Sequence, residues 1–271
     1  MYNRHIIAKE VTSMPANYAH YRFGQSCLPL LPEDARRTVR RFRSLYEAGL
    51  HGPDPFFFYN PVLPTKTGKL GTVYHKMTGR TFFENAARRK PSEGAIAYLY
   101  GVLAHYCLDA ACHPLINAWA AEGKAGHTEI ETELDRQLLE RDKKSPARCQ
   151  NTASRLRLTR GEAETTAWVY PPATTGQIRR CFRHMKLICA CLASRSGIVR
   201  RLTCQIVKLA GANGRGMVMG DGPNERCAWA VQPLMQRYHG ALRAFPDMAR
   251  QLQDRFTRKV PLGEEFNEFF G

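Results

Sequence analysis

The sequence HYCLDAACHP at residues 105–114 decides the expected fold, because it places ionisable side chains inside a long apolar segment. Successive residues of an α-helix are rotated by about 100°, so His105, Asp109 and His113 would form one stripe on one helix face. Two imidazoles and a carboxylate in such a stripe suit zinc. The surrounding residues 92–120 are apolar and favour a helix. We therefore predict a core helix that carries a metal site.

A second motif strengthens the metal interpretation. His127 and Glu131 have the same i, i+4 spacing, and Asp135 follows one turn later on the same face. One such pair alone is more often a surface pair or a satisfied core histidine. Several ionisable groups buried among apolar residues are costly unless a charged partner satisfies them. Two pairs, with His127 following His105 by 22 residues, favour a metal cluster between two packed helices.

The remaining sequence predicts a mostly helical chain without alternating strands. Ser92 is the expected N-cap of the core helix. A glycine- and proline-rich aromatic loop is expected at 51–61, a second loop up to about residue 74, and a glycine-rich loop at 211–223. Residues 143–172 are polar and give no clear pattern. The other helices are expected at 32–49, 126–141, 177–210 (broken near Ser196 and Gly197), 228–244 and 246–258.

Length and composition set the class of protein. The chain has 271 residues, 44% hydrophobic and 24% charged, which excludes a disordered or collagen-like protein. We expect a single all-α domain over 1–271, a multi-helix bundle with a metal-site part at about 15–142 and a basic helical part at about 150–271. The longest strongly apolar run, 187–193, falls short of the roughly 20 residues of a membrane span, so none is expected.

Cysteines and the first residues bear on location. Nine cysteines show no disulfide framework, and the first ten residues contain no apolar signal segment. These features predict a cytoplasmic protein with mostly free thiols, and secretion stays open if the true start lies upstream.

The combined motifs resemble the bacterial zinc-dependent phospholipase C family, an all-helical fold with up to three zinc ions. The pieces that carry the resemblance are AHYRFG at 19–24, GPDP at 52–55, His75, His105-x-x-x-Asp109, His113-Pro114 and His127-x-x-x-Glu131. The resemblance implies three ligand sets: Asp54, His75, His105 and Asp109 for one zinc; His113, His127 and Glu131 for a second; and His20 with a bridging Asp109 for a third. It also makes Asp54 a candidate catalytic base. Clustered cations activate water and stabilise phosphate charge.

The sequence departs from the secreted members of that family in two places. Those members complete the third site with an N-terminal tryptophan, whereas this sequence starts with Met1 and has no tryptophan near it. In addition, His113 follows Asp109 by four residues, slightly sooner than expected. The number of zinc ions in the expected site, two or three, therefore stays open.

The resemblance implies a zinc-dependent phosphodiester hydrolase, most simply one acting on phospholipid. Two alternatives stay open: a single-strand zinc nuclease of the same fold, and a cytosolic metal-binding module without hydrolase activity. The net charge of +16 favours anionic partners. The basic segment 177–210 fits an anionic membrane surface, a nucleic-acid backbone, or an ordinary solvated face. The sequence makes no prediction of oligomeric state.

Weaker signals surround these motifs. His51 lies three residues before Asp54 and is either a site-lining or an ordinary loop histidine. The aromatic run 56–59 either forms the wall of a substrate pocket or packs in the core.

Overall fold

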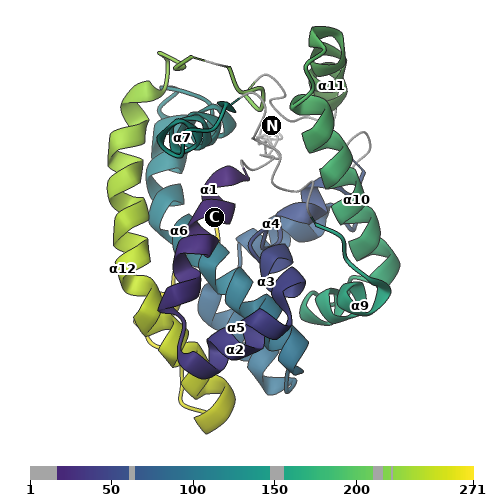
Figure 1. Cartoon of the computed structure of the whole chain (residues 1–271), viewed down its shortest axis with the longest axis vertical. Helices are drawn as coiled ribbons and strands as arrows, with labels where there is room; N and C mark the ends of the chain where they lie inside the picture. Colours follow the sequence, from purple (N-terminus) through teal and green to yellow (C-terminus); the bar gives the residue numbers. More distant parts are fainter. Residues whose placement is uncertain (1–16, 61–64, 147–155, 210–215, 221) are drawn as a thin grey trace, which may run out of the picture.

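The computed structural model describes residues 17–60, 65–146, 156–209, 216–220 and 222–271. This part of the chain is all-α, as predicted; its β pairing is one bridge between Thr78 and Phe269. Residues 1–16 and part of the expected loop 211–223, namely 211–215 and 221, lie outside the described residues. The α-helices shown in Figure 1 are α1 (Tyr18–Cys27), α2 (Glu33–Arg41), α3 (Arg43–Gly49), α4 (Lys69–His75), α5 (Gly79–Arg88), α6 (Glu93–Ala121), α7 (His127–Arg141), α9 (Arg160–Val169), α10 (Thr175–Leu192), α11 (Gly197–Leu209) and α12 (Ala228–Arg258).

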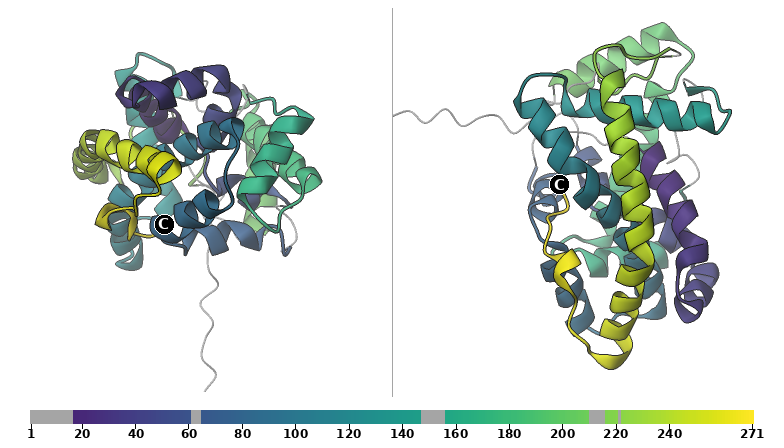
Figure 2. Two further views of the ribbon diagram at one scale, coloured as in Figure 1. Left: turned by 90° about the horizontal axis from the view of Figure 1, so that it is seen from below. Right: turned by 90° about the vertical axis from the view of Figure 1, so that its left-hand side faces the viewer.

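Helix α6 forms the centre of the core, and the predicted helix at 92–120 is confirmed. Its first turn is capped by Ser92, whose hydroxyl accepts a hydrogen bond from the Ala95 amide at 3.3 Å. By length and composition α6 is apolar enough to cross a membrane, which the sequence analysis did not recognise. However, 83% of its apolar window is buried inside the fold. Packing against α1, α2, α3 and α12 therefore accounts for its apolar length (Figures 1 and 2).

Helices α3 and α6 cross with their backbones in contact. A Cβ added at Gly49 would lie 2.2 Å from the Tyr98 carbonyl oxygen, and one added at Gly101 would lie 2.2 Å from the Tyr46 carbonyl oxygen. Only glycine fits at both positions. The segment after α3 therefore reaches His105 of α6: the Leu50 carbonyl oxygen lies 3.2 Å from His105 Nδ1. Asp54, the first residue of the 3-10 helix η2 (Asp54–Phe58), has its Oδ1 3.9 Å from His105 Nε2.

Two predicted helix boundaries were wrong. The expected helix at 32–49 is two helices, because Phe42 leaves helical geometry with φ −117° and ψ 47°. The break allows both α2 and α3 to pack on α6. The two helices expected at 228–244 and 246–258 are one, α12, which continues through Pro233 and Pro246. Its buried positions keep helical spacing past both prolines, so packing maintains the helix where each proline removes a hydrogen bond.

Several short helices were not predicted. Helices α1, α5 and α9 lie in regions for which no element was predicted. Helix α4 forms where the second loop was expected, up to about residue 74, and η2 forms in the expected proline-rich loop at 51–61; both loop predictions were wrong there. Helix α9 has a capping box, in which Thr159 and Glu162 exchange side-chain and backbone hydrogen bonds, so its start was readable from sequence. The predicted break between α10 and α11 is confirmed, and α7 begins at His127 within the predicted segment.

Candidate metal centre

Eight ionisable side chains from five elements meet beside the middle of α6. Helix α6 supplies three of them in the predicted stripe; the others come from α1, η2, the end of α4 and the start of α7. They form three groups, in each of which the potential ligand atoms lie within 4.8 Å of one another. The groups are His20, His105 and Asp109; Asp54, His75 and His105; and His113, His127 and Glu131.

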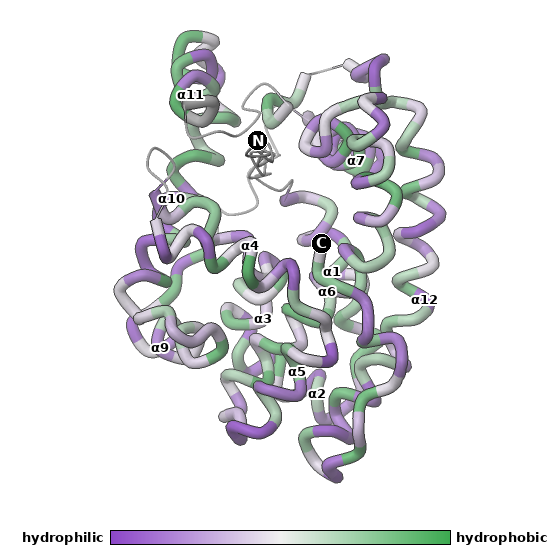
Figure 3. Tube along the Cα trace, turned by 180° about the vertical axis from the view of Figure 1, so that it is seen from behind, coloured by the Kyte–Doolittle hydropathy of each residue, from purple (hydrophilic) through white to green (hydrophobic). Residues whose placement is uncertain are grey.

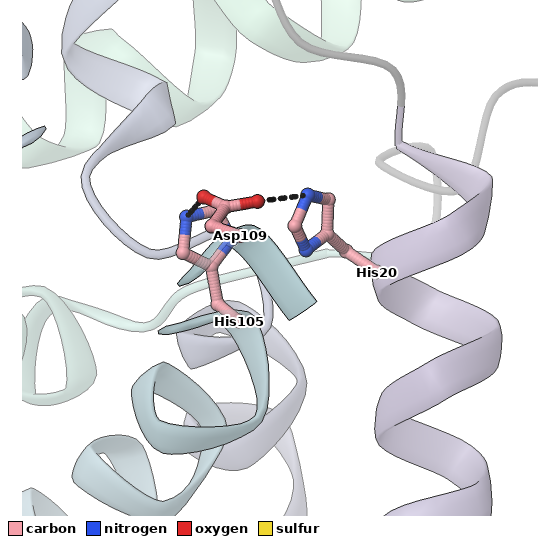
Figure 4. Close-up of side chains that lie close together, drawn as sticks. All are labelled: His20, His105 and Asp109. Carbon is pink, nitrogen blue, oxygen red and sulfur yellow. Dashed lines mark ion pairs between the residues drawn. The ribbon is translucent and has the colours of Figure 1, made fainter. Parts of the chain in front are cut away.

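Asp109 is the centre of the first group. Its Oδ1 lies 3.2 Å from His20 Nε2, and its Oδ2 lies 2.8 Å from His105 Nε2, so one carboxylate connects α1 to α6 (Figure 4). The rings of His20 and His105 stack with centroids 4.3 Å apart. Because each oxygen of Asp109 faces a different histidine, the carboxylate is placed to be shared between two sites.

Asp54 and Glu131 organise the other two groups. Asp54 Oδ1 lies 3.1 Å from His75 Nε2 and 3.9 Å from His105 Nε2. Glu131 Oε1 lies 3.3 Å from His113 Nε2 and 3.2 Å from His127 Nε2. His113 Nε2 is also 3.6 Å from Asp109 Oδ1, which makes the three groups contiguous.

These spacings fit shared cations better than direct hydrogen bonds. Two nitrogen or oxygen ligands on one tetrahedral zinc, each about 2.0–2.1 Å from the ion, lie about 3.3 Å apart. Most of the histidine–carboxylate distances lie near that value. Glu131 Oε2 is buried and has no hydrogen-bond partner, which is costly for a carboxylate unless an ion occupies the space beside it. The donor set of imidazoles and carboxylates therefore fits zinc.

The pKa values of the clustered histidines and carboxylates also indicate a cation site. Burial is the largest single influence on the pKa of His20 and of His113 and lowers both. The charges and hydrogen bonds of the neighbouring carboxylates, with Asp109 the strongest, together outweigh burial and raise both pKa values to about 9. Burial would raise the pKa of Asp109 and of Glu131, yet the neighbouring histidines hold both pKa values well below the ordinary range. Without a metal ion, protons on His20 and His113 balance the charge of the buried carboxylates. A cation would replace those protons.

Backbone carbonyls fix two of the histidine rings. His75 Nδ1 lies 2.8 Å from the Gly71 carbonyl oxygen, and His105 Nδ1 lies 3.2 Å from the Leu50 carbonyl oxygen. Each contact leaves the Nε2 atom directed at a carboxylate. This arrangement is typical of metal-binding histidines, whose second nitrogen is held by an outer group. The sequence carries no signal for these carbonyls.

The loop before Asp54 packs directly on the site. Gly52 has φ +49°, and a Cβ there would lie 2.3 Å from His105 Cδ2, so this position requires glycine. His51 is buried beside the cluster, and burial lowers its pKa to about 3. It is therefore neutral at physiological pH. No group of potential metal ligands found among the described residues includes His51.

Asp135 does not join any of the three groups, although the sequence placed it on the ligand face of α7. Its two oxygens accept hydrogen bonds from the Tyr18 and Ala19 amides, at 2.8 and 2.7 Å. Asp135 thus caps the first turn of α1 from another helix. Burial raises its pKa to about 7, and the two amide bonds act in the opposite direction. The cap positions His20, one residue further along.

The last residues of the chain also reach the site, which sequence reasoning missed. The Phe270 and Gly271 amides donate to the carbonyl oxygens of Met77 and His75, at 3.3 and 3.2 Å. A Cβ at Gly271 would lie 2.4 Å from His113 Nδ1 and 3.0 Å from His75 Cδ2. The buried Phe270 ring of this segment packs against Tyr106, with centroids 4.9 Å apart.

The aromatic run after Asp54 is divided between core and site. Phe56 and Phe58 are buried in the core, whereas Phe57 is half-buried and its ring lies 5.2 Å from the His75 ring. The side chains of His75, His113 and His127 are the more exposed ones of the cluster, at 14, 11 and 22%. The cluster is therefore most exposed to solvent at His75 and His127.

Comparison with known families agrees with this arrangement. A profile of the family described as zinc dependent phospholipase C matches residues 19–183, which is more than half of the chain. The chain therefore belongs to the zinc-dependent phospholipase C family, and the resemblance drawn from its motifs is confirmed. Searches of curated proteins and of solved structures gave no match.

Proposed function

We propose that the eight clustered side chains bind two or three zinc ions and that the protein hydrolyses a phosphodiester, with phospholipid as its substrate class. The proposed ligands are His20, Asp54, His75, His105, Asp109, His113, His127 and Glu131. The observation that carries the proposal is the convergence of three contiguous donor groups beside α6, in a chain of this family.

The proposed role of each side chain follows from its position in the cluster. Asp109 faces three histidines and Glu131 faces two, so these carboxylates hold the cluster together and supply the negative charge that would retain cations. Zinc bound here would act as a Lewis acid toward the phosphate ester and lower the pKa of water. Asp54 is proposed to accept the proton of the attacking water. Its Oδ1 lies 3.1 Å from His75 Nε2 and 3.9 Å from His105 Nε2, so its carboxylate is part of the cluster.

The exposed part of the cluster is the proposed side of approach for water and substrate. His75 and His127 are the most exposed side chains of the cluster, whereas His105 and Asp109 are almost fully buried. A phosphodiester would therefore approach from the side of His75 and His127 with its non-bridging oxygens. The buried carboxylates remain shielded from solvent and keep their electrostatic effect.

The test is hydrolysis by the full chain, purified without an affinity tag and loaded with zinc. Phosphatidylcholine vesicles, single-stranded DNA and a soluble chromogenic phosphodiester are offered separately. We expect diacylglycerol and a phosphorylated head group, together with cleavage of the chromogenic compound. Asp54→Asn is expected to abolish both reactions. Asp247→Asn, an exposed acidic position on α12, is the matched control and should retain both.

Two results would replace this proposal. Release of nucleotides from DNA with no lipid hydrolysis would assign the site to a single-strand nuclease. A full zinc complement with no hydrolysis of any of the three substrates would make the protein a metal-binding module.

A further inference from the structure

Exposed apolar side chains gather on α10 and α11. Among the described residues, ten large hydrophobic side chains are exposed, and five of them lie on these two helices: Leu187, Ile198, Val199, Leu202 and Ile206. Helix α11 packs against α10 at one end of the molecule (Figure 1), and hydrophobic and hydrophilic residues alternate along it (Figure 3). Single exposed apolar residues are ordinary, but a concentration of them on one element marks an interaction site.

The apolar residues of α11 share one helix face. Ile198, Leu202 and Ile206 follow one another at intervals of four residues, and with Val199 they span an arc of about 100°. The exposed fractions of the three are 72, 54 and 47%. We call Ile198, Val199, Leu202 and Ile206 the α11 face. It has the width of the buried stripe of an amphipathic helix, yet it is turned toward solvent.

The charges beside this face are all of one sign. Helix α11 contains no acidic residue. Arg201 is exposed and lies beside Ile198, about 60° away around the helix. Arg195, just before the helix, is also exposed. An apolar face flanked by arginine, with no acidic group along the helix, matches a helix that lies in the interface of an anionic bilayer. A nucleic-acid groove would present arginine where this face presents isoleucine and leucine.

We propose that the α11 face docks on the surface of an anionic phospholipid bilayer, with its apolar side chains in the interface and Arg201 at the head groups. This inference builds on the proposed function, because a bilayer would also hold the substrate. Helix α10 connects the docking helix to the site: His184 Nδ1 lies 2.8 Å from the carbonyl oxygen of Tyr59, directly after the 3-10 helix that carries Asp54. Docking through α11 would therefore retain the catalytic site at the lipid surface.

The experiment measures binding of the full chain to vesicles by flotation. One set contains equal amounts of phosphatidylglycerol and phosphatidylcholine, and the other contains phosphatidylcholine alone. The variant is Ile198→Glu combined with Leu202→Glu. Its control is Val260→Glu, an exposed apolar position beyond the end of α12. We expect the wild type and the control to bind the anionic vesicles. The double variant should bind at least about tenfold more weakly, given the apolar area that each side chain would bury.

Two further measurements separate this inference from the proposed function. Zinc content and hydrolysis of the soluble phosphodiester should be unchanged in the double variant, because the α11 face lies outside the metal cluster. Vesicle binding that depends on α11, in a protein without hydrolase activity, would support the docking surface and refute the proposed function. Equal vesicle binding by wild type and double variant would overturn the docking surface. The docking surface would also be overturned if the wild type did not bind vesicles and the double variant instead lost a dimer or lost binding to single-stranded DNA.

Discussion

Asp109 connects two helices through two histidines: its Oδ1 lies 3.2 Å from His20 Nε2 on α1, and its Oδ2 lies 2.8 Å from His105 Nε2 on α6. The first contact lies at a spacing typical of ligands that share a zinc ion, and the second at a direct contact distance. Asp109 Oδ1 also lies 3.6 Å from His113 Nε2, so this carboxylate approaches three of the five clustered histidines.

Replacing Gly52 by alanine should displace His105. The new Cβ would lie 2.3 Å from the His105 ring at a residue whose φ is +49°. The positive φ alone costs roughly 1–2 kcal/mol for a residue other than glycine. Gly123→Ala is the matched control, because Gly123 has φ +72° and nothing within 4 Å of its added Cβ.

Thermal unfolding and zinc content of the two variants are the measurements. Both variants should lose stability, but only Gly52→Ala should lose zinc. Equal zinc content in the two variants would show that contact with the His105 ring does not matter for metal binding.

Removing the Phe270 ring should destabilise the fold and loosen the site. Phe270 is fully buried, and its backbone amide is bonded to Met77, two residues after His75. Truncation of a buried phenylalanine to alanine costs about 3–5 kcal/mol. Phe269→Ala, at a neighbouring side chain that is 56% exposed, should change the free energy of unfolding by less than about 0.5 kcal/mol. Chemical denaturation measures both, and a small effect at Phe270 would argue against its packing role.

Zinc binding should release protons. In the metal-free protein His20 and His113 have pKa values of about 9, above the ordinary 6.5. Their contribution to metal-free stability is therefore present below pH 6.5 and is lost as the pH rises toward 9. Zinc requires the neutral imidazole, so below pH 9 it must displace these protons, and its apparent affinity should rise with pH up to about 9.

Titration calorimetry at pH 7.5 in buffers of different ionisation enthalpy measures this release. We expect at least one proton per chain when the protein is fully loaded. Binding enthalpies that do not depend on the buffer would contradict the electrostatic description of the site.

Local spacing explains what the sequence predicted well. His105, Asp109 and His113 lie on one helix, so periodicity alone placed them on one face. The pair of His127 and Glu131 was readable for the same reason. His20, Asp54 and His75 come from separate elements with no common period, and only the family resemblance assigned them to the site.

Tertiary contacts explain what the sequence could not predict. Helix α1 begins without a side-chain cap of its own, because Asp135 on α7 accepts its first amides. On α7 that aspartate looked like a further metal ligand. Likewise, backbone carbonyl oxygens hold His75 and His105, and every residue type has such an oxygen, so the sequence gives no signal for these contacts. The approach of Gly271 to His113 brings together residues far apart in the sequence, which no local pattern predicts.

The most direct test of the account is zinc content per chain, measured by plasma mass spectrometry on protein purified without added metal or affinity tag. The comparison includes wild type, Asp109→Ala, His127→Ala and the exposed control Asp247→Ala. We predict two or three zinc ions for the wild type and the control. His127→Ala should lose one ion, and Asp109→Ala should lose more than His127→Ala because its carboxylate is shared. Wild-type zinc content in Asp109→Ala, or no stoichiometric zinc in the wild type after zinc is added back, would contradict the account.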